Sequence, residues 1–197
     1  MNINFCKALF VAAFIGMSSS GYGQTAGHIN PFLSEYATPY GVPPFDKITI
    51  QDYKEAFLKG MQEQKEEIEA IVNQRSTPDF ENTIAAMDRS GRLLSKVEYV
   101  FYSQNSCNTN AEMQALNQEI SPLLSAHSDD ISLNPKLFAR VKRVYENKEK
   151  FNLDKEQSKL LENTYKSFVR NGANLSEADQ KKLRDLNSKI SMLQITF

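Results

Sequence analysis

The sequence lacks several features that common functions require. Its 197 residues hold only two cysteines and two histidines, and they contain no glycine-rich phosphate loop. A disulfide-rich scaffold and phosphate-loop nucleotide binding are therefore excluded. An excess of one charge is also missing, because 23 Lys and Arg residues oppose 24 Asp and Glu residues for a formal net charge of −1. This balance gives no electrostatic reason to bind nucleic acid or an acidic membrane surface.

The first 23 residues are predicted to be a signal peptide. A single lysine precedes a ten-residue apolar run at residues 8–17, and small residues follow as far as Gly23. The run is well short of the ~20 residues that span a bilayer. The alternative is an uncleaved membrane anchor. Cleavage near Gly23 predicts an exported, periplasmic protein that has no membrane contact once the signal is removed.

Removal of the signal peptide also removes Cys6 and leaves Cys107 as the lone cysteine. A lone thiol in an exported protein is either buried or paired elsewhere, and burial as a small apolar side chain is the favoured expectation. The alternative is a nucleophilic Cys–His pair, but nothing in the sequence brings His28 or His127 close to Cys107.

Residues 24–48 are predicted to form an extended leader and a proline-rich strap. The polar residues 24–30 are expected to be loose, with Phe32 and Leu33 docking the chain after them. Three prolines lie within residues 39–46, which excludes helix interior and central strand there. Tyr40 and Phe45 are expected to anchor this strap across the helices.

Residues 49–197 predict an all-α domain of about six long antiparallel helices. Apolar residues recur there with the 3.6-residue period of amphipathic helices. Thr49 and Asp52 form a capping-box-like start for the first helix, which is about six turns long. The acidic face at residues 63–69 is interpreted as solvated surface. Starts of the later helices are predicted near residues 78, 111, 135, 154 and 176.

Four details of these helices are open to structural test. Thr77 is expected to cap a helix that begins at Pro78 and runs to about residue 104, with Gly91 in its interior. Pro122 is expected to kink or interrupt the third helix. In the fourth helix, Arg140 is placed on the outward face.

The segment from His127 to Asn134 contains one histidine and two adjacent aspartates, Asp129 and Asp130. One interpretation is a metal or acid–base site. The favoured one is a network at the end of the helix, in which Asp and Ser side chains satisfy free backbone groups. The favoured interpretation follows because the patch supplies neither helical ligand spacing nor a third ligand.

The last helix carries an apolar stripe that reaches the end of the sequence. Its members step by 3, 4, 3 and 4 residues, the spacing of a helix–helix seam: Leu183, Leu186, Ile190, Leu193 and Phe197. The stripe ends without a cap or polar tail, so the helical domain is expected to be truncated. The part from Leu193 to Phe197 is then expected to pack on downstream sequence.

Four separated sequence blocks carry a resemblance to a known family. They are Asn-Pro-Phe-Leu at 30–33, Thr-Pro-Tyr-Gly-Val-Pro-Pro-Phe-Asp at 38–46, Phe-Glu-Asn-Thr-Ile at 80–84 and Ser-Pro-Leu-Leu-Ser-Ala-His at 121–127. From residue 30 onward the chain resembles the thimet oligopeptidase-type zinc peptidases, specifically their peptidyl-dipeptidase branch. The resemblance implies the helical beginning of a larger enzyme, where it forms one wall of a deep substrate channel.

The resemblance assigns no catalytic or metal residue to this chain. The family's His-Glu-x-x-His motif is absent, and His28 and His127 are far apart in sequence. The resemblance therefore implies zinc only in the complete parent, with none bound by this chain. It also implies short peptides as substrates of the parent's catalytic part, while the substrate-binding residues of this segment stay unassigned. The alternatives are a helical peptide-binding or adaptor module without catalysis, and a degenerate peptidase that retains peptide binding.

Overall fold

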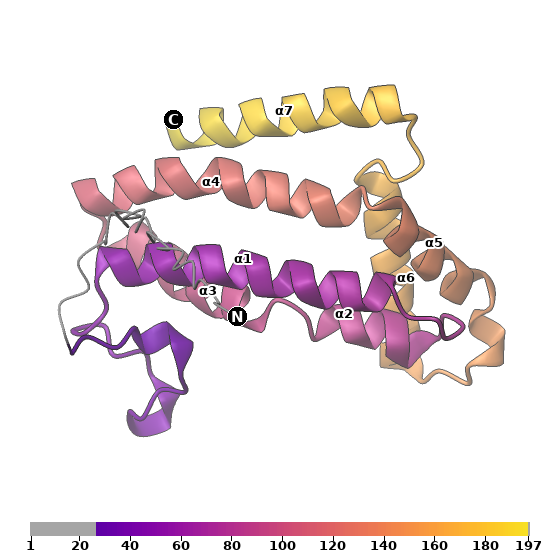
Figure 1. Ribbon diagram of the computed structural model, residues 1–197, viewed down its shortest axis with the longest axis horizontal. Coiled ribbons are helices and arrows are strands. Elements are labelled where there is room, and N and C mark those ends of the chain that lie inside the picture. The colour runs from indigo at the N-terminus through magenta and orange to yellow at the C-terminus, as the bar shows by residue number, and fades with distance from the viewer. Residues whose placement is uncertain (1–26, 197) are drawn as a thin grey trace, which may run out of the picture.

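The computed structural model describes residues 27–196, and the predicted signal peptide lies outside this range. The described residues form helices and turns with no β-strand, which confirms the all-α prediction (Figure 1). The α-helices are α1 (Ile50–Val72), α2 (Ala86–Asp88), α3 (Arg92–Cys107), α4 (Ala111–Ser132), α5 (Pro135–Glu146), α6 (Lys155–Arg170) and α7 (Glu177–Thr196). Short 3₁₀ turns are η1 (Pro31–Leu33), η2 (Pro39–Gly41) and η4 (Lys148–Lys150), and η3 (Phe80–Ala85) is a π-helical turn.

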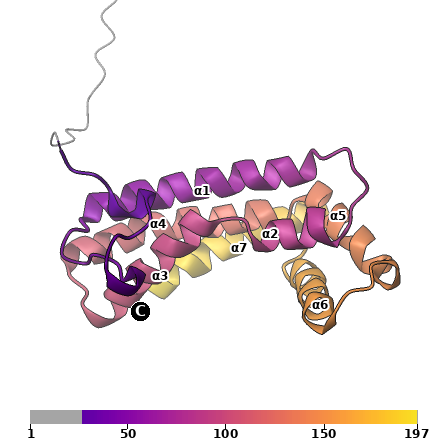
Figure 2. The same ribbon diagram turned by 90° about the horizontal axis from the view of Figure 1, so that it is seen from below.

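Four helices are stacked lengthwise, and two others lie across one end. Helices α1, α3, α4 and α7 alternate in direction, whereas α5 and α6 run across the long axis (Figures 1 and 2). The antiparallel arrangement predicted from the sequence therefore holds for these four helices but not for α5 and α6 (Figures 1 and 2). Helix α7 packs mainly on α4, on the side away from α1. None of the described helices is long and apolar enough to cross a membrane.

The start of α1 shows how local chemistry fixes a helix. Asp52 Oδ2 accepts hydrogen bonds from the backbone N–H and the hydroxyl of Thr49, both at 2.7 Å, and Thr49 Oγ1 accepts from the Asp52 N–H. This capping box confirms the predicted start. Farther along, Gly60 lies against α3, where an added Cβ would come within 2.8 Å of the Leu94 backbone. Glycine therefore permits the close α1–α3 approach.

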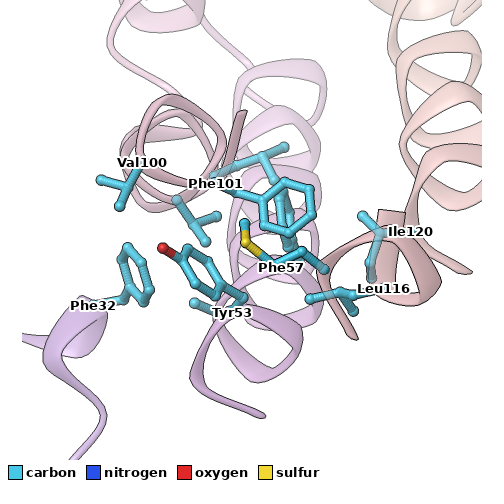
Figure 3. Packing of buried hydrophobic residues seen from close by; sticks show 11 residues of the cluster. Phe32, Tyr53, Phe57, Val100, Phe101, Leu116 and Ile120 are labelled. Atoms are coloured by element: carbon cyan, nitrogen blue, oxygen red, sulfur yellow. The ribbon is translucent and has the colours of Figure 1, made fainter. Parts of the chain in front are cut away.

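One hydrophobic core lies between α1, α3 and the first half of α4 (Figure 3). Tyr53 and Phe57 project from α1 toward Phe101 of α3, with ring centroids 5.3 Å apart in both pairs. Phe32 of η1 closes the cluster 5.1 Å from the Tyr53 ring, and Ile120 of α4 is fully buried. Aromatic pairs at these separations add to the area they bury.

A second core lies at the other end, where α5 and α6 meet η3 and the end of α1. Phe138 of α5 stacks on Tyr165 and Phe168 of α6, with centroids 6.0 and 5.8 Å apart. Tyr145 stacks on Tyr165 at 4.0 Å. These rings fix α6 across the end of the bundle.

The prediction of one continuous helix from Pro78 to residue 104 was wrong. Asp79, not Thr77, is the N-cap, because its side chain accepts from the Asn82 N–H at 2.7 Å while Asn82 Oδ1 accepts from the Asp79 N–H at 3.1 Å. The π-helical turn η3 and α2 follow, and the helix then breaks at Gly91. Gly91 has φ 71°, a left-handed conformation that glycine adopts readily. The apolar period continues across this break, so the sequence pattern conceals it.

The strap was predicted to dock through its aromatic residues, and this was also wrong. Tyr40 is fully exposed and Phe45 is 45% exposed. The docking residue is Phe32, which is buried as predicted, whereas Leu33 is 38% exposed. The Lys96 ammonium holds η1 and the residue after it by donating to the backbone carbonyls of Phe32 at 3.1 Å and Ser34 at 2.6 Å.

Three further side-chain predictions need correction. Cys107 is exposed rather than buried, since it lies in the last turn of α3. Pro122 does not interrupt α4, which runs from residue 111 to 132. Arg140 is buried, not outward, because Asn82 Oδ1 accepts from its Nη2 at 2.9 Å and the carbonyl of Gln74 accepts from its Nη1. Hydrogen bonds to a buried charge offset part of the cost of removing it from water.

Candidate functional site

The two histidines contact different polar residues. His28 Nε2 lies 2.9 Å from both carboxylate oxygens of the buried Asp52. His127 Nε2 lies 2.8 Å from Gln64 Oε1, and burial lowers the pKa of His127. His28 lies in the segment predicted to be loose, and this contact fixes it to the start of α1, whereas residues 24–26 of that segment lie outside the described residues. Asn30 strengthens this contact by donating to the Asp52 carbonyl.

The aspartates after His127 bind another helix rather than the end of their own. Asn187 of α7 donates to the buried Asp129 at 2.7 Å, and Arg184 donates to Asp130 at 2.8 Å. The favoured interpretation, a network at the helix end, was therefore wrong for these two side chains. They form a polar contact that holds α7 on α4.

These contacts allow a direct test of whether the chain fits the zinc ion that the resemblance implies for the parent. Catalytic zinc takes three protein ligands and one open position. Across residues 27–196, no group of three or more His, Cys, Asp or Glu side chains is arranged to hold a metal ion. Because His28 and His127 pair with different residues, the described part of the chain does not fit a catalytic zinc site.

A groove of about 520 Å³ lies where α4 and α6 face each other. Helix α6 packs against α5 and η3, so it crosses the long axis near the C-terminal end of α4 (Figure 1). The groove is lined by residues of α1, α2, α3, α4 and α6 and by the residue that follows α6: Gln64, Met87, Leu94, Glu98, Leu124, His127, Ser128, Ile131, Ser132, Asn163, Thr164, Ser167, Phe168 and Asn171. This volume is within the range of small-ligand sites.

The spacing of the lining residues explains how the groove forms. Leu124, His127 and Ile131 recur on one face of α4, while Asn163 and Ser167 recur on one face of α6. Each helix therefore turns a strip of mixed apolar and polar side chains toward the other. No sequence motif marked this groove, because it depends on how α6 crosses the bundle.

Glu98 is the one formally charged side chain among the described residues that line the groove. It projects from α3 one position after the fully buried Val97. Burial raises the pKa of Glu98. In the described part of the chain, no hydrogen bond or ion pair joins its carboxylate to another side chain. Sequence reasoning missed this residue, although a glutamate beside a buried valine was the available signal.

A larger cavity, of about 680 Å³, has a different character. It lies beside the start of α6, and its lining is rich in charged residues, among them Lys148, Glu149, Lys159 and Glu162. Glu162 already pairs with Lys159 at 3.2 Å and with Lys166. Exposed pairs of this kind stabilise each other weakly and indicate ordinary surface.

Helix α7 presents a second surface of interest. Leu186, Ile190 and Leu193 of the predicted stripe are 50–58% exposed, while α7 contacts α4 through Arg184 and Asn187. We call these three apolar residues the α7 outer stripe. Partial exposure of successive members leaves an apolar face without a covering element among the described residues.

Fold and surfaces together define a helical segment with a ligand-sized groove and no metal-ligand set in its described residues. Sequence comparison shows that this segment is homologous to peptidases. It is 41% identical to the dipeptidyl carboxypeptidase of Escherichia coli over 169 residues, and 41% identical to that of Salmonella typhimurium over 168 residues. It is 25% identical to oligopeptidase A of Escherichia coli over 168 residues. No family model matches the chain.

The extent of these matches is uneven. They cover 83–86% of this chain but only 24–25% of each relative, so the chain spans about a quarter of the length of the curated relatives it matches. The resemblance to thimet oligopeptidase-type peptidases is confirmed. The coverage is consistent with a chain that corresponds to the N-terminal part of such an enzyme.

Proposed function

We propose that this chain is the N-terminal helical segment of an exported zinc peptidase that releases C-terminal dipeptides from short peptides. The observation that carries the proposal is the 41% identity to two dipeptidyl carboxypeptidases over a quarter of their length. The zinc site belongs to the rest of the parent, because the described residues do not fit one. Export rests on the signal-like pattern of residues 1–23.

In the parent, the segment forms part of the wall of the substrate channel. The α7 outer stripe is the surface that packs against the remainder of the enzyme. Leu186, Ile190 and Leu193 support this role because half-exposed apolar residues at seam spacing are typical of an interface.

Two experiments test the proposal. Sequencing the coding DNA beyond the codon for Phe197 is expected to reveal an in-frame His-Glu-x-x-His motif. The purified 197-residue chain, supplied with zinc and a blocked tripeptide, is expected to release no dipeptide. An uninterrupted reading frame without the motif would contradict the peptidase parent. Release that a chelator abolishes would instead place the catalytic site within this chain.

A further inference from the structure

We infer that the groove between α4 and α6 binds the ammonium group of a short peptide, with Glu98 as its counter-ion. This inference rests on the proposed function for the choice of a peptide, while the cation preference comes from the groove itself. A groove with one carboxylate and no competing cation in its described lining favours a positively charged ligand. An ammonium group matches this chemistry because it carries three hydrogen-bond donors and no acceptor.

The surroundings of Glu98 fit such a ligand. Hydroxyl and amide side chains on α4 and α6, including Ser128, Asn163 and Ser167, supply oxygen acceptors along the groove. Leu94 and Phe168 are buried residues that add apolar surface. A peptide needs both, because its backbone is polar and its side chains bury apolar area.

The partial burial of Glu98 makes its carboxylate a better partner for a ligand cation than the exposed carboxylates. Half-buried carboxylates are less well hydrated than exposed ones, so a cation that reaches Glu98 gains more than it does at the surface. Exposed glutamates such as Glu162 already have lysine partners, Lys159 and Lys166. Glu98 differs from them because no side chain in the described part of the chain neutralises it.

Amide NMR of the 197-residue chain tests the inference with three short peptides and requires no catalysis. Trialanine amide offers a free α-amino group, N-acetyl-Ala-Lys-Ala amide offers only a lysine ammonium, and N-acetyl-trialanine amide offers neither. One or both of the cationic probes are expected to shift the signals of Ser128, Asn163 and Ser167 saturably, while the doubly blocked peptide does not. The two cationic arms show which ammonium the groove accepts.

Glu98→Gln keeps the shape of the side chain and removes its charge. It is expected to weaken the binding of the cationic probe about tenfold, because the carboxamide keeps an acceptor in place but loses the charge that strengthens its hydrogen bond to an ammonium. Glu98→Asp is expected to have a smaller effect, because it retains the charge. Glu66→Gln is the matched control, since Glu66 is exposed on α1 and outside the groove.

Several outcomes would overturn the inference. One is an absence of saturable shifts in the groove for every probe. Another is that the doubly blocked peptide binds as tightly as the cationic probes. The third is that Glu98→Gln and Glu66→Gln lose the same affinity for the cationic probe. Circular dichroism of each variant checks that it retains its helices. Because the binding assay needs no turnover, such a failure leaves the peptidase proposal intact. Conversely, if the parent has no peptidase activity, the binding of ammonium groups measured for this chain still stands.

Discussion

Helices α1 and α7 carry apolar stripes of similar spacing but occupy opposite environments. Tyr53 and Phe57 of α1 are 5% and 0% exposed, whereas Leu186 and Leu193 of α7 are 54% and 58% exposed. The stripe of α1 packs against α3 and α4, and α7 is held on α4 partly by polar contacts at Arg184. Periodicity therefore predicts which face of a helix is apolar, but the partner of that face depends on tertiary structure.

The first prediction tests the buried side of this comparison. Phe57→Ala is expected to lower the free energy of unfolding by about 3–5 kcal/mol, because it removes a fully buried ring and leaves a cavity. Urea denaturation of the 197-residue chain, followed by helical circular dichroism, measures the loss. The control is Leu58→Ala on the same helix, where the side chain is 45% exposed. Equal losses in the free energy of unfolding of both variants would show that α1 does not bury the face that carries Phe57.

A second prediction concerns the close approach of α1 and α3. Gly60→Ala is expected to destabilise the chain by about 1–3 kcal/mol, because the new Cβ meets backbone atoms of Leu94 that cannot rotate away. The same denaturation measurement applies, with Lys59→Ala at an exposed neighbouring position as the control. Stabilisation by Gly60→Ala, the usual gain of alanine over glycine in a helix, would contradict this packing.

A third prediction addresses the polar contact between α4 and α7. Asp129→Ala is expected to lower stability by about 1 kcal/mol, because it leaves Asn187 without the carboxylate it donates to. The matched control is Asp130→Ala, which removes an exposed ion pair with Arg184 and is expected to cost less. A double-mutant cycle with Asn187→Ala measures the coupling. Strictly additive losses would show that the two residues do not interact.

Two helix starts that depend on side chains within a few residues could be predicted from the sequence, although the start at Asp79 was placed two residues too early. Thr49 with Asp52, and Asn110 with its bond to the Met113 N–H, cap the expected helices. Contacts between distant residues could not be predicted in this way. Arg140 is buried because Asn82, 58 positions earlier, accepts from its guanidinium. A single sequence shows the charge of Arg140 but not the folded position of Asn82.

The groove illustrates the same limit. Glu98 and Ser167 lie on separate helices with no motif between them, and they share a groove because aromatic stacking holds α6 across the bundle. The resemblance in four sequence blocks correctly indicated the peptidase relatives, but it assigned no substrate-binding residue. A site built by helix crossing becomes visible only when the crossing is known.

The last prediction has the smallest expected effect and tests the exposed side of the comparison. Leu193→Ser is expected to change the free energy of unfolding of the isolated chain by no more than about 0.5 kcal/mol, because the side chain is already 58% exposed. Val97→Ser, at a fully buried position on α3, is the contrasting control with a large expected loss. If the α7 outer stripe packs against the rest of a peptidase parent, Leu193→Ser in that parent destabilises it more than in the isolated chain, as thermal denaturation of both proteins measures. An equal small effect in both proteins would show that Leu193 stays in water and that another surface joins this segment to the enzyme.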